Sequence, residues 1–346
     1  MKTTNEKLED WVIKKIENEF TDDVCLLLDH KTLRLDKDNE MGKTGLESYV
    51  PITPKAHGLA RTFIIDGIGY DLFLQTWERF EKMADVDHYN LTCLDDAVII
   101  WARTDADRQR FESLQARLRA NLKNPQLMHD RAQKWINSAI ELFADTLFEN
   151  RVHVIRQNAG YICDLLSIAL AYTNGTFFHH GQSKQIEELR KMANIPDNFV
   201  ECYKKVVLEK DPDMQKKLCH SLLYLAKEHV KSFEKKKPSC KRNPMEIADW
   251  YHELSYTWRR VYHFCETDDP VSTYLWACML QEELGQVANE YMVPMFDILS
   301  AFDSENLKFF AENAKKAESA IIKAIEADGG KVDRYASIDE FLEKNA

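Results

Sequence analysis

The chain up to Thr104 alternates amphipathic segments with short apolar runs. Its opening predicts a helix, because apolar residues recur there at helical spacing: Leu8, Trp11, Val12, Ile16 and Phe20. Buried strands are predicted at 23–29, 46–53 and 97–102, and a short helix at 76–84. This mixture of elements predicts a small α/β domain.

Two further strands are predicted within FIIDGIGYDLF, residues 63–73. The apolar runs on either side are separated by Asp66 and Gly67, a pair that tolerates the positive φ angles of a tight turn. We therefore predict a β-hairpin with this pair at its tip.

After Thr104 the pattern changes to long segments of helical period, beginning with a helix at 105–122 that carries acidic residues in its first turn. Proline and glycine interrupt these segments at 125, 175, 196, 212, 270 and 329–330. EKKKPSCKRNP, residues 234–244, is cationic and poor in apolar residues, and is the best linker candidate. The predicted fold class is α+β, with domains at 1–122, 123–237 and 245–346.

Composition excludes some classes of function. The formal net charge of -11 argues against nonspecific coating of nucleic acid, which depends on many Lys or Arg contacts with phosphate. The eight cysteines form no CxxC pair, no leader sequence is recognisable, and no apolar run reaches membrane-spanning length. We expect a reduced cytoplasmic protein that does not enter a membrane. Nothing in the sequence indicates its oligomeric state.

Asp71 is unusual because it interrupts an apolar strand, where a carboxylate is costly to bury without a partner. One interpretation is a structural carboxylate that caps a nearby loop. The other pairs it with Glu47, which begins the strand ESYVPI. Carboxylates on adjacent strands can share a Mg²⁺ ion that also holds phosphate. An edge charge in solvent is the alternative for Glu47.

MGKTG, residues 41–45, contains part of a phosphate-binding loop. It lacks the first glycine of the GxxxxGK[ST] pattern, and no clear helix follows. A loop that merely contains Lys43 is the simpler interpretation, although Lys43 or Lys31 could still contact a phosphate.

The aromatic-rich helix predicted at 249–264 places Glu253, Thr257 and Arg260 on one face. These residues form either a buried ionic network or the wall of a pocket for a polar substrate. His179 and His180 follow a predicted helix end. Adjacent histidines make a poor metal site, so we predict that they cap that helix.

The segment KTGLESYVPITPKAHGLARTFIIDGIGYDLFLQTWERFEKMADV resembles the nucleotidyltransferase domain of the polymerase-β-like superfamily, in particular bacterial relatives of the aminoglycoside nucleotidyltransferases. NAGYICDLLSIALAYTNGTFFHHG and LRKMANIPDNFVECYKKVV resemble the helical bundle attached to that domain. The resemblance implies a small mixed sheet, a Gly-Ser turn that holds the nucleotide phosphates, and three carboxylates that bind Mg²⁺.

Residue by residue, the resemblance assigns Asp71 to the third carboxylate and Glu47 to the second position of an Asp-x-Asp pair. Gly45 occupies the first position of that pair, and Asp29-His30 stands where the Gly-Ser turn is expected. The active-site pattern is therefore degenerate. Acidic residues at 36, 38 and 40 offer substitute ligands.

Two hypotheses follow. In the first, the protein transfers a nucleoside monophosphate from an NTP–Mg complex to a hydroxyl acceptor held between the α/β and helical domains. Asp71 and Glu47 hold the metal, Lys43 or Lys31 contacts phosphate, and Glu253 and Arg260 contribute to the acceptor pocket. In the second, the nucleotidyltransferase fold persists without catalysis, as a module that binds a ligand or a partner protein.

Overall fold

The computed structural model describes residues 4–30, 46–65, 67–234, 243–291 and 295–345. The chain divides into two compact units, Met1–Lys235 and Lys236–Ala346. The boundary falls within the predicted linker, whereas the boundary predicted at 122/123 lies inside the first unit.

The N-terminal part of the first unit contains a five-stranded mixed sheet, as predicted for an α+β protein. Its order is β3-β4-β2-β1-β5, in which β2 and β4 are parallel and the other neighbours antiparallel. The strands are β1 (Val24–Asp29), β2 (Leu46–Pro51), β3 (Arg61–Ile65), β4 (Ile68–Leu74) and β5 (Val98–Ala102). The prediction that 97–102 is a buried strand is wrong in one respect. β5 pairs with β1 alone in this sheet, so it forms an edge, and its residues are partly exposed.

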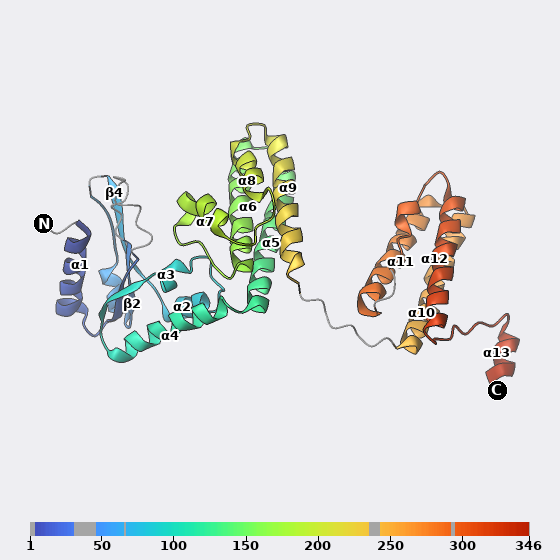
Figure 1. The fold of residues 1–346 in the computed structure, drawn as a ribbon, viewed down its shortest axis with the longest axis horizontal. Coiled ribbons are helices and arrows are strands. Elements are labelled where there is room, and N and C mark those ends of the chain that lie inside the picture. Colours follow the sequence, from blue (N-terminus) through green and yellow to red (C-terminus); the bar gives the residue numbers. More distant parts are fainter. Residues whose placement is uncertain (1–3, 31–45, 66, 235–242, 292–294, 346) are drawn as a thin grey trace. The chain divides into compact units, whose positions relative to one another are not determined.

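Each face of the sheet has its own apolar core, because successive residues of a strand point to opposite faces. Leu27, Tyr49 and Leu72 pack with α1 (Thr4–Lys15), the π-helical turn η1 (Ile16–Phe20) and the short helix η4 (Pro54–Leu59). Leu28 and Val50 pack on the other face with α2 (Trp77–Ala84) and α4 (Asp105–Asn121). Figure 1 shows α1 on one side of the strands and α2 and α4 on the other.

The hairpin predicted at 63–73 is confirmed. Ile65 pairs with Ile68 across a two-residue connection between β3 and β4. Gly67 has a φ of 77°, the left-handed conformation that glycine adopts without strain. Asp66 lies outside the described residues.

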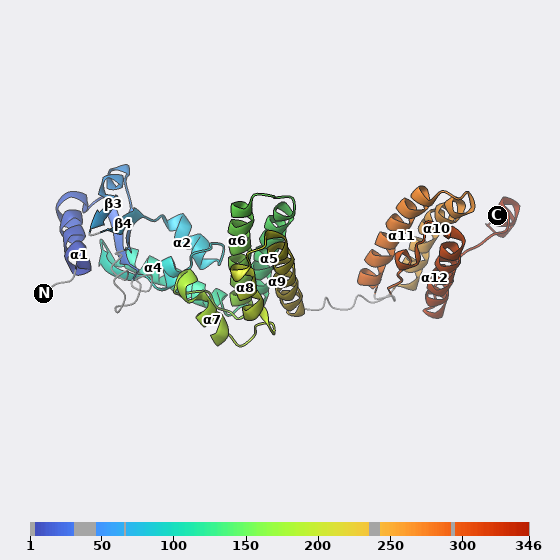
Figure 2. The same cartoon turned by 90° about the horizontal axis from the view of Figure 1, so that it is seen from above.

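The rest of the first unit is helical. Its helices are α5 (Pro125–Leu147), α6 (Val152–Thr173), α7 (Gln185–Lys191), α8 (Phe199–Leu208) and α9 (Pro212–Ser232). Prolines begin α5 and α9, as predicted, and the preceding residues Asn124 and Asp211 accept hydrogen bonds from the first turn. Both views show α5, α6 and α9 side by side (Figures 1 and 2).

One core runs from the sheet into this bundle. Leu28 of β1 and Phe111 of α4 belong to the same buried cluster as Ile136 of α5, Leu166 of α6 and Leu222 of α9. The bundle and the α/β part therefore fold against each other. This shared core fixes the surfaces where they meet.

The second unit consists of α10 (Pro244–Glu266), α11 (Pro270–Tyr291), α12 (Leu307–Ala327) and the short α13 (Ile338–Asn345). Trp258, Leu280 and Phe310 lie in its separate core. In the described parts of both units, every helix is too short or too polar to cross a bilayer.

Candidate functional site

Asp71 lies on β4 and is half-buried. Its Oδ1 accepts a hydrogen bond from the hydroxyl of Thr62 at 2.9 Å, across the β3–β4 hairpin. The carboxylate therefore has a neutral partner on a neighbouring strand. This hydrogen bond to a strand residue is not the predicted cap of a loop. On its own it also does not identify Asp71 as a metal ligand.

The strand register does not bring Asp71 and Glu47 together. Asp71 pairs with Leu46 on β2, whereas position 47 pairs with Leu72 on β4 and with Asp29 on β1. Because successive positions of a strand alternate between faces, this register assigns positions 47 and 71 to opposite faces. The side chain of Glu47 lies outside the described residues.

Two polar residues of the neighbouring strands, His30 and Ser48, are joined by a hydrogen bond that does not include Asp71. His30, which follows β1, is buried; its Nε2 is hydrogen-bonded to Ser48 Oγ at 2.8 Å, and its ring stacks on Phe73. Within the described residues, no group of three or more His, Cys, Asp or Glu side chains could hold a metal ion. The described side chains around Asp71 thus do not fit a carboxylate-bound Mg²⁺, and the metal remains a prediction. Lys31 and Lys43 lie outside the described residues.

Glu253 and Arg260 both lie on α10 of the second unit. The Arg260 guanidinium lies over the rings of Tyr256 and Trp276, at 4.1 and 4.0 Å from their centroids, and so connects α10 with α11. Glu253 lines a cavity of about 250 Å³ together with Glu282 and Glu283. Arg260 is not among the residues that line that cavity, and the predicted roles of Glu253 and Arg260 in an acceptor pocket stay untested.

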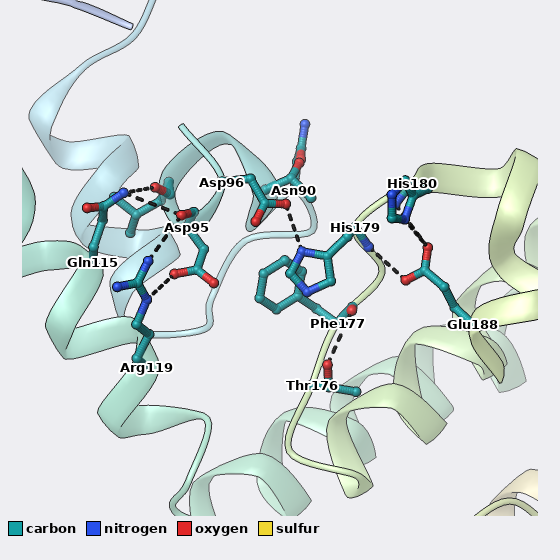
Figure 3. A network of polar contacts seen from close by, with 12 residues as sticks. Asn90, Asp95, Asp96, Gln115, Arg119, Thr176, Phe177, His179, His180 and Glu188 are labelled. Atoms are coloured by element: carbon teal, nitrogen blue, oxygen red, sulfur yellow. Dashed lines mark hydrogen bonds and ion pairs between the residues drawn. The ribbon is translucent and has the colours of Figure 1, made fainter. Parts of the chain in front are cut away.

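His179 and His180 do not cap the preceding helix, contrary to the prediction. His179 Nδ1 donates to Asp96 Oδ2 at 2.7 Å, and this hydrogen bond raises the pKa of His179. His180 Nδ1 and the backbone N–H groups of both histidines donate to the carboxylate of Glu188 on α7. The carboxylates are stronger acceptors than helix carbonyls, and they fasten the segment after α6 (Figure 3).

The His179–Asp96 contact lies at a junction between the α/β part and the helical bundle of the first unit. Figure 3 also shows the contacts that hold the segment around Asp96 on the α/β side of this junction. Arg119 Nε donates to Asp95 Oδ1 at 2.6 Å, and Gln115 Nε2 donates to the carbonyl groups of Leu94 and Ala97. Both donors come from α4. They fix the corner that carries Asp96, and the His179–Asp96 contact then links this corner to the bundle side.

A cavity of about 300 Å³ lies at this junction, and we call it the amide cavity. Tyr89, Asn90 and Thr92 come from the α/β side. The bundle side contributes residues of α6, α7 and the segment between them, which include one carboxylate together with aromatic and amide side chains: Asp164, Tyr172, Phe177, Phe178, Gln182 and Gln185. A mostly apolar cavity with a few placed polar groups is typical of small-molecule sites.

Asp164 is the acidic residue of this cavity. Its Oδ1 accepts from Gln185 Nε2 at 2.6 Å, and Gln185 Oε1 accepts from the Tyr203 hydroxyl at 2.8 Å. Burial raises the pKa of Asp164, and burial also raises the pKa of Tyr203 to about 12, so the phenol stays a donor. This chain of hydrogen bonds orients both the amide and the carboxyl group. Among the described residues, Asp164 Oδ2 receives no hydrogen bond.

Sequence reasoning missed Asp164, although a signal was present. It is an isolated carboxylate within the apolar stretch YICDLLSIALAY of α6, just as Asp71 is within its strand. The same physical argument, that a carboxylate in an apolar element needs a partner, applied to both.

Neither a protein-family model nor a curated protein sequence matches this chain. Among solved structures, it is similar to a nucleotidyltransferase-like protein from Exiguobacterium sibiricum. That match covers 93% of this chain and 92% of the other, with 11% sequence identity and a TM-score of 0.35. At these values the likeness carries no argument about fold or activity.

Proposed function

We propose that this protein binds a nucleoside-class ligand, with the base in the amide cavity between the α/β part and the bundle. The observation that carries this proposal is the Asp164–Gln185–Tyr203 chain, which orients a carboxylate in the wall of an aromatic-lined cavity. This function is a specific form of the binding-module hypothesis, and it needs no metal at Asp71.

The chemistry of the walls favours a flat ring that carries an amino group. The aromatic side chains, such as Phe177 and Phe178, offer apolar ring surfaces to a planar ligand. A carboxylate accepts hydrogen bonds, so Asp164 Oδ2 would take one from an exocyclic amine. Adenine, cytosine and guanine provide that amine.

Calorimetric titration with adenosine and purine riboside tests the proposal, because the two nucleosides differ only in the exocyclic amine. We expect adenosine to bind about tenfold more tightly, the effect of one hydrogen bond to a charged acceptor of about 1.5 kcal/mol. Asp164→Asn keeps the shape and an acceptor for Gln185 but removes the charge. It should bring adenosine to the affinity of purine riboside.

Asp145→Asn is the matched control, because Asp145 is an exposed carboxylate on α5 of the same bundle. It should bind adenosine like the wild type. Equal affinity for the two nucleosides, or an Asp164→Asn variant that still prefers adenosine, would contradict the assignment. The absence of binding by every nucleoside would contradict the function itself.

Nucleotidyl transfer is the second candidate function. It is supported by one observation: Asp71 lies on β4, which is later in the chain than β2 and pairs with it. The family resemblance likewise takes the third carboxylate from a later strand than the Asp-x-Asp pair. In this proposal Asp71 binds Mg²⁺ on its own face of the sheet, Lys43 or Lys31 contacts the phosphates, and a small hydroxyl compound is the acceptor. Release of pyrophosphate from an NTP with Mg²⁺ would support it, provided that Asp71→Asn abolishes the release.

A further inference from the structure

A second cavity of about 450 Å³ lies where the segment 86–89 meets α5. We call it the cationic cavity, because Arg131 and Lys134 line it. Tyr89 and Trp135 add aromatic surface. Tyr89 also lines the amide cavity, so one side chain borders both spaces.

The positive charges of this cavity are only partly balanced. Arg131 Nη1 and Lys134 Nζ both donate to the same atom, Asp87 Oδ1, at 2.8 and 3.2 Å. Two cations therefore share one carboxylate. Arg131 also donates from Nη2 to the Asp85 carbonyl group, and within the described residues its Nε is buried without a hydrogen-bond partner.

His88, which also lines the cavity, lies within hydrogen-bonding distance of two N–H groups. The backbone N–H of Asn90 donates to His88 Nδ1 at 3.0 Å, and Arg79 Nε lies 3.2 Å from His88 Nε2. Burial, and then the charge of Arg79, lower the pKa of His88, so the ring is neutral at pH 7. A neutral imidazole has one acceptor nitrogen, so only one of these two donors can be satisfied by the ring.

We propose that the cationic cavity holds an anionic group of the same ligand, the phosphate of a nucleoside monophosphate whose base occupies the amide cavity. The inference rests on the proposed function. A phosphate would accept hydrogen bonds from Arg131 and Lys134 and add the negative charge that Asp87 alone does not supply. Tyr89, which borders both cavities, would then contact the sugar between base and phosphate. The competing explanation is that these ion pairs only fasten the segment 86–89 to α5.

The test compares adenosine with AMP in calorimetric titrations of the full chain. We expect AMP to bind at least tenfold more tightly than adenosine to the wild type. Lys134→Gln should remove about tenfold of AMP affinity and leave adenosine unchanged, because Lys134 is largely exposed and is not a core residue. Lys227→Gln, at an exposed position of α9, is the matched control and should change neither.

The titrations distinguish failure of the phosphate site from failure of the proposed function. If adenosine binds and AMP is no tighter, or Lys134→Gln weakens both equally, the phosphate site is wrong and the base site stands. If neither adenosine nor AMP binds, the proposed function fails together with this inference. Titration with inorganic phosphate tests whether free phosphate binds without a nucleoside. Phosphate binding that Lys134→Gln weakens would support the anion site in the cationic cavity but not the base site in the amide cavity.

Discussion

At the scale of single residues, His179 joins the segment after α6 to Asp96 of the α/β part. The hydrogen bond from its Nδ1 to Asp96 raises the pKa of His179 above its ordinary value of 6.5. The folded state therefore binds the proton of this ring more strongly than the unfolded chain does. The stability that this contact contributes is fully present below pH 6.5 and is lost as the pH rises through the folded-state pKa.

His179→Asn should abolish this dependence on pH. We expect the wild type to exceed the variant in free energy of unfolding by on the order of 1 kcal/mol below pH 6.5, since the pair is only partly exposed, and by less at pH 8. Urea unfolding of both proteins at the two pH values measures the difference. His153→Asn, at an exposed position near the start of α6, is the control. A difference that grows with pH would contradict the assignment.

Asp71 is expected to be a modest structural residue. Its carboxylate is half-buried and accepts one hydrogen bond from a hydroxyl. The amide oxygen of Asn can accept the same bond, so Asp71→Asn should lower the free energy of unfolding by less than about 1 kcal/mol. Thermal unfolding measures this change. A loss well above that value would show that Asp71 has buried partners that the variant leaves unsatisfied.

At the scale of elements, the hairpin depends on one backbone conformation. Gly67 has a φ of 77°, whereas Gly69, two residues later in β4, does not have a positive φ, and a Cβ at either position meets no atom within 4 Å. Gly67→Val should therefore lower stability by about 1–3 kcal/mol through backbone strain alone. Gly69→Val is the matched control and should be neutral or stabilising, because valine favours strands. Equal melting temperatures of the two variants would refute the turn.

Most elements could be predicted because their signals are local. The proline and glycine breaks matched the starts of α5, α9, α10 and α11, and Asp66-Gly67 indicated the hairpin. The register of β2 against β4 could not be predicted, because it is set by packing between residues distant in sequence. That register separates positions 47 and 71. Likewise, the sequence could not show that α7 and Tyr89 complete a cavity around Asp164 of α6, because they are distant from it in sequence.

At the scale of the whole molecule, the two units have separate cores. The buried cluster of the second unit draws only on residues from Ile247 to Ile325, and none of them belongs to the clusters of the first unit. We therefore expect a fragment of residues 243–346 to fold without the rest of the chain. A cooperative thermal transition of that fragment, followed by circular dichroism, would confirm this. A fragment that is helical but melts without cooperativity would contradict it.

We propose that the ligand binds at the junction of the α/β part and the bundle, and that Asp71, in the middle of β4, does not hold it. Calorimetric titration of AMP and ATP, with and without Mg²⁺, into the wild type, Asp164→Asn and Asp71→Asn tests it most directly. We predict AMP binding that does not require Mg²⁺, is weakened about tenfold by Asp164→Asn and is unchanged in Asp71→Asn. Binding of ATP that requires Mg²⁺ and disappears in Asp71→Asn, with Asp164→Asn unaffected, would contradict ligand binding at the junction and support a metal site at Asp71 instead.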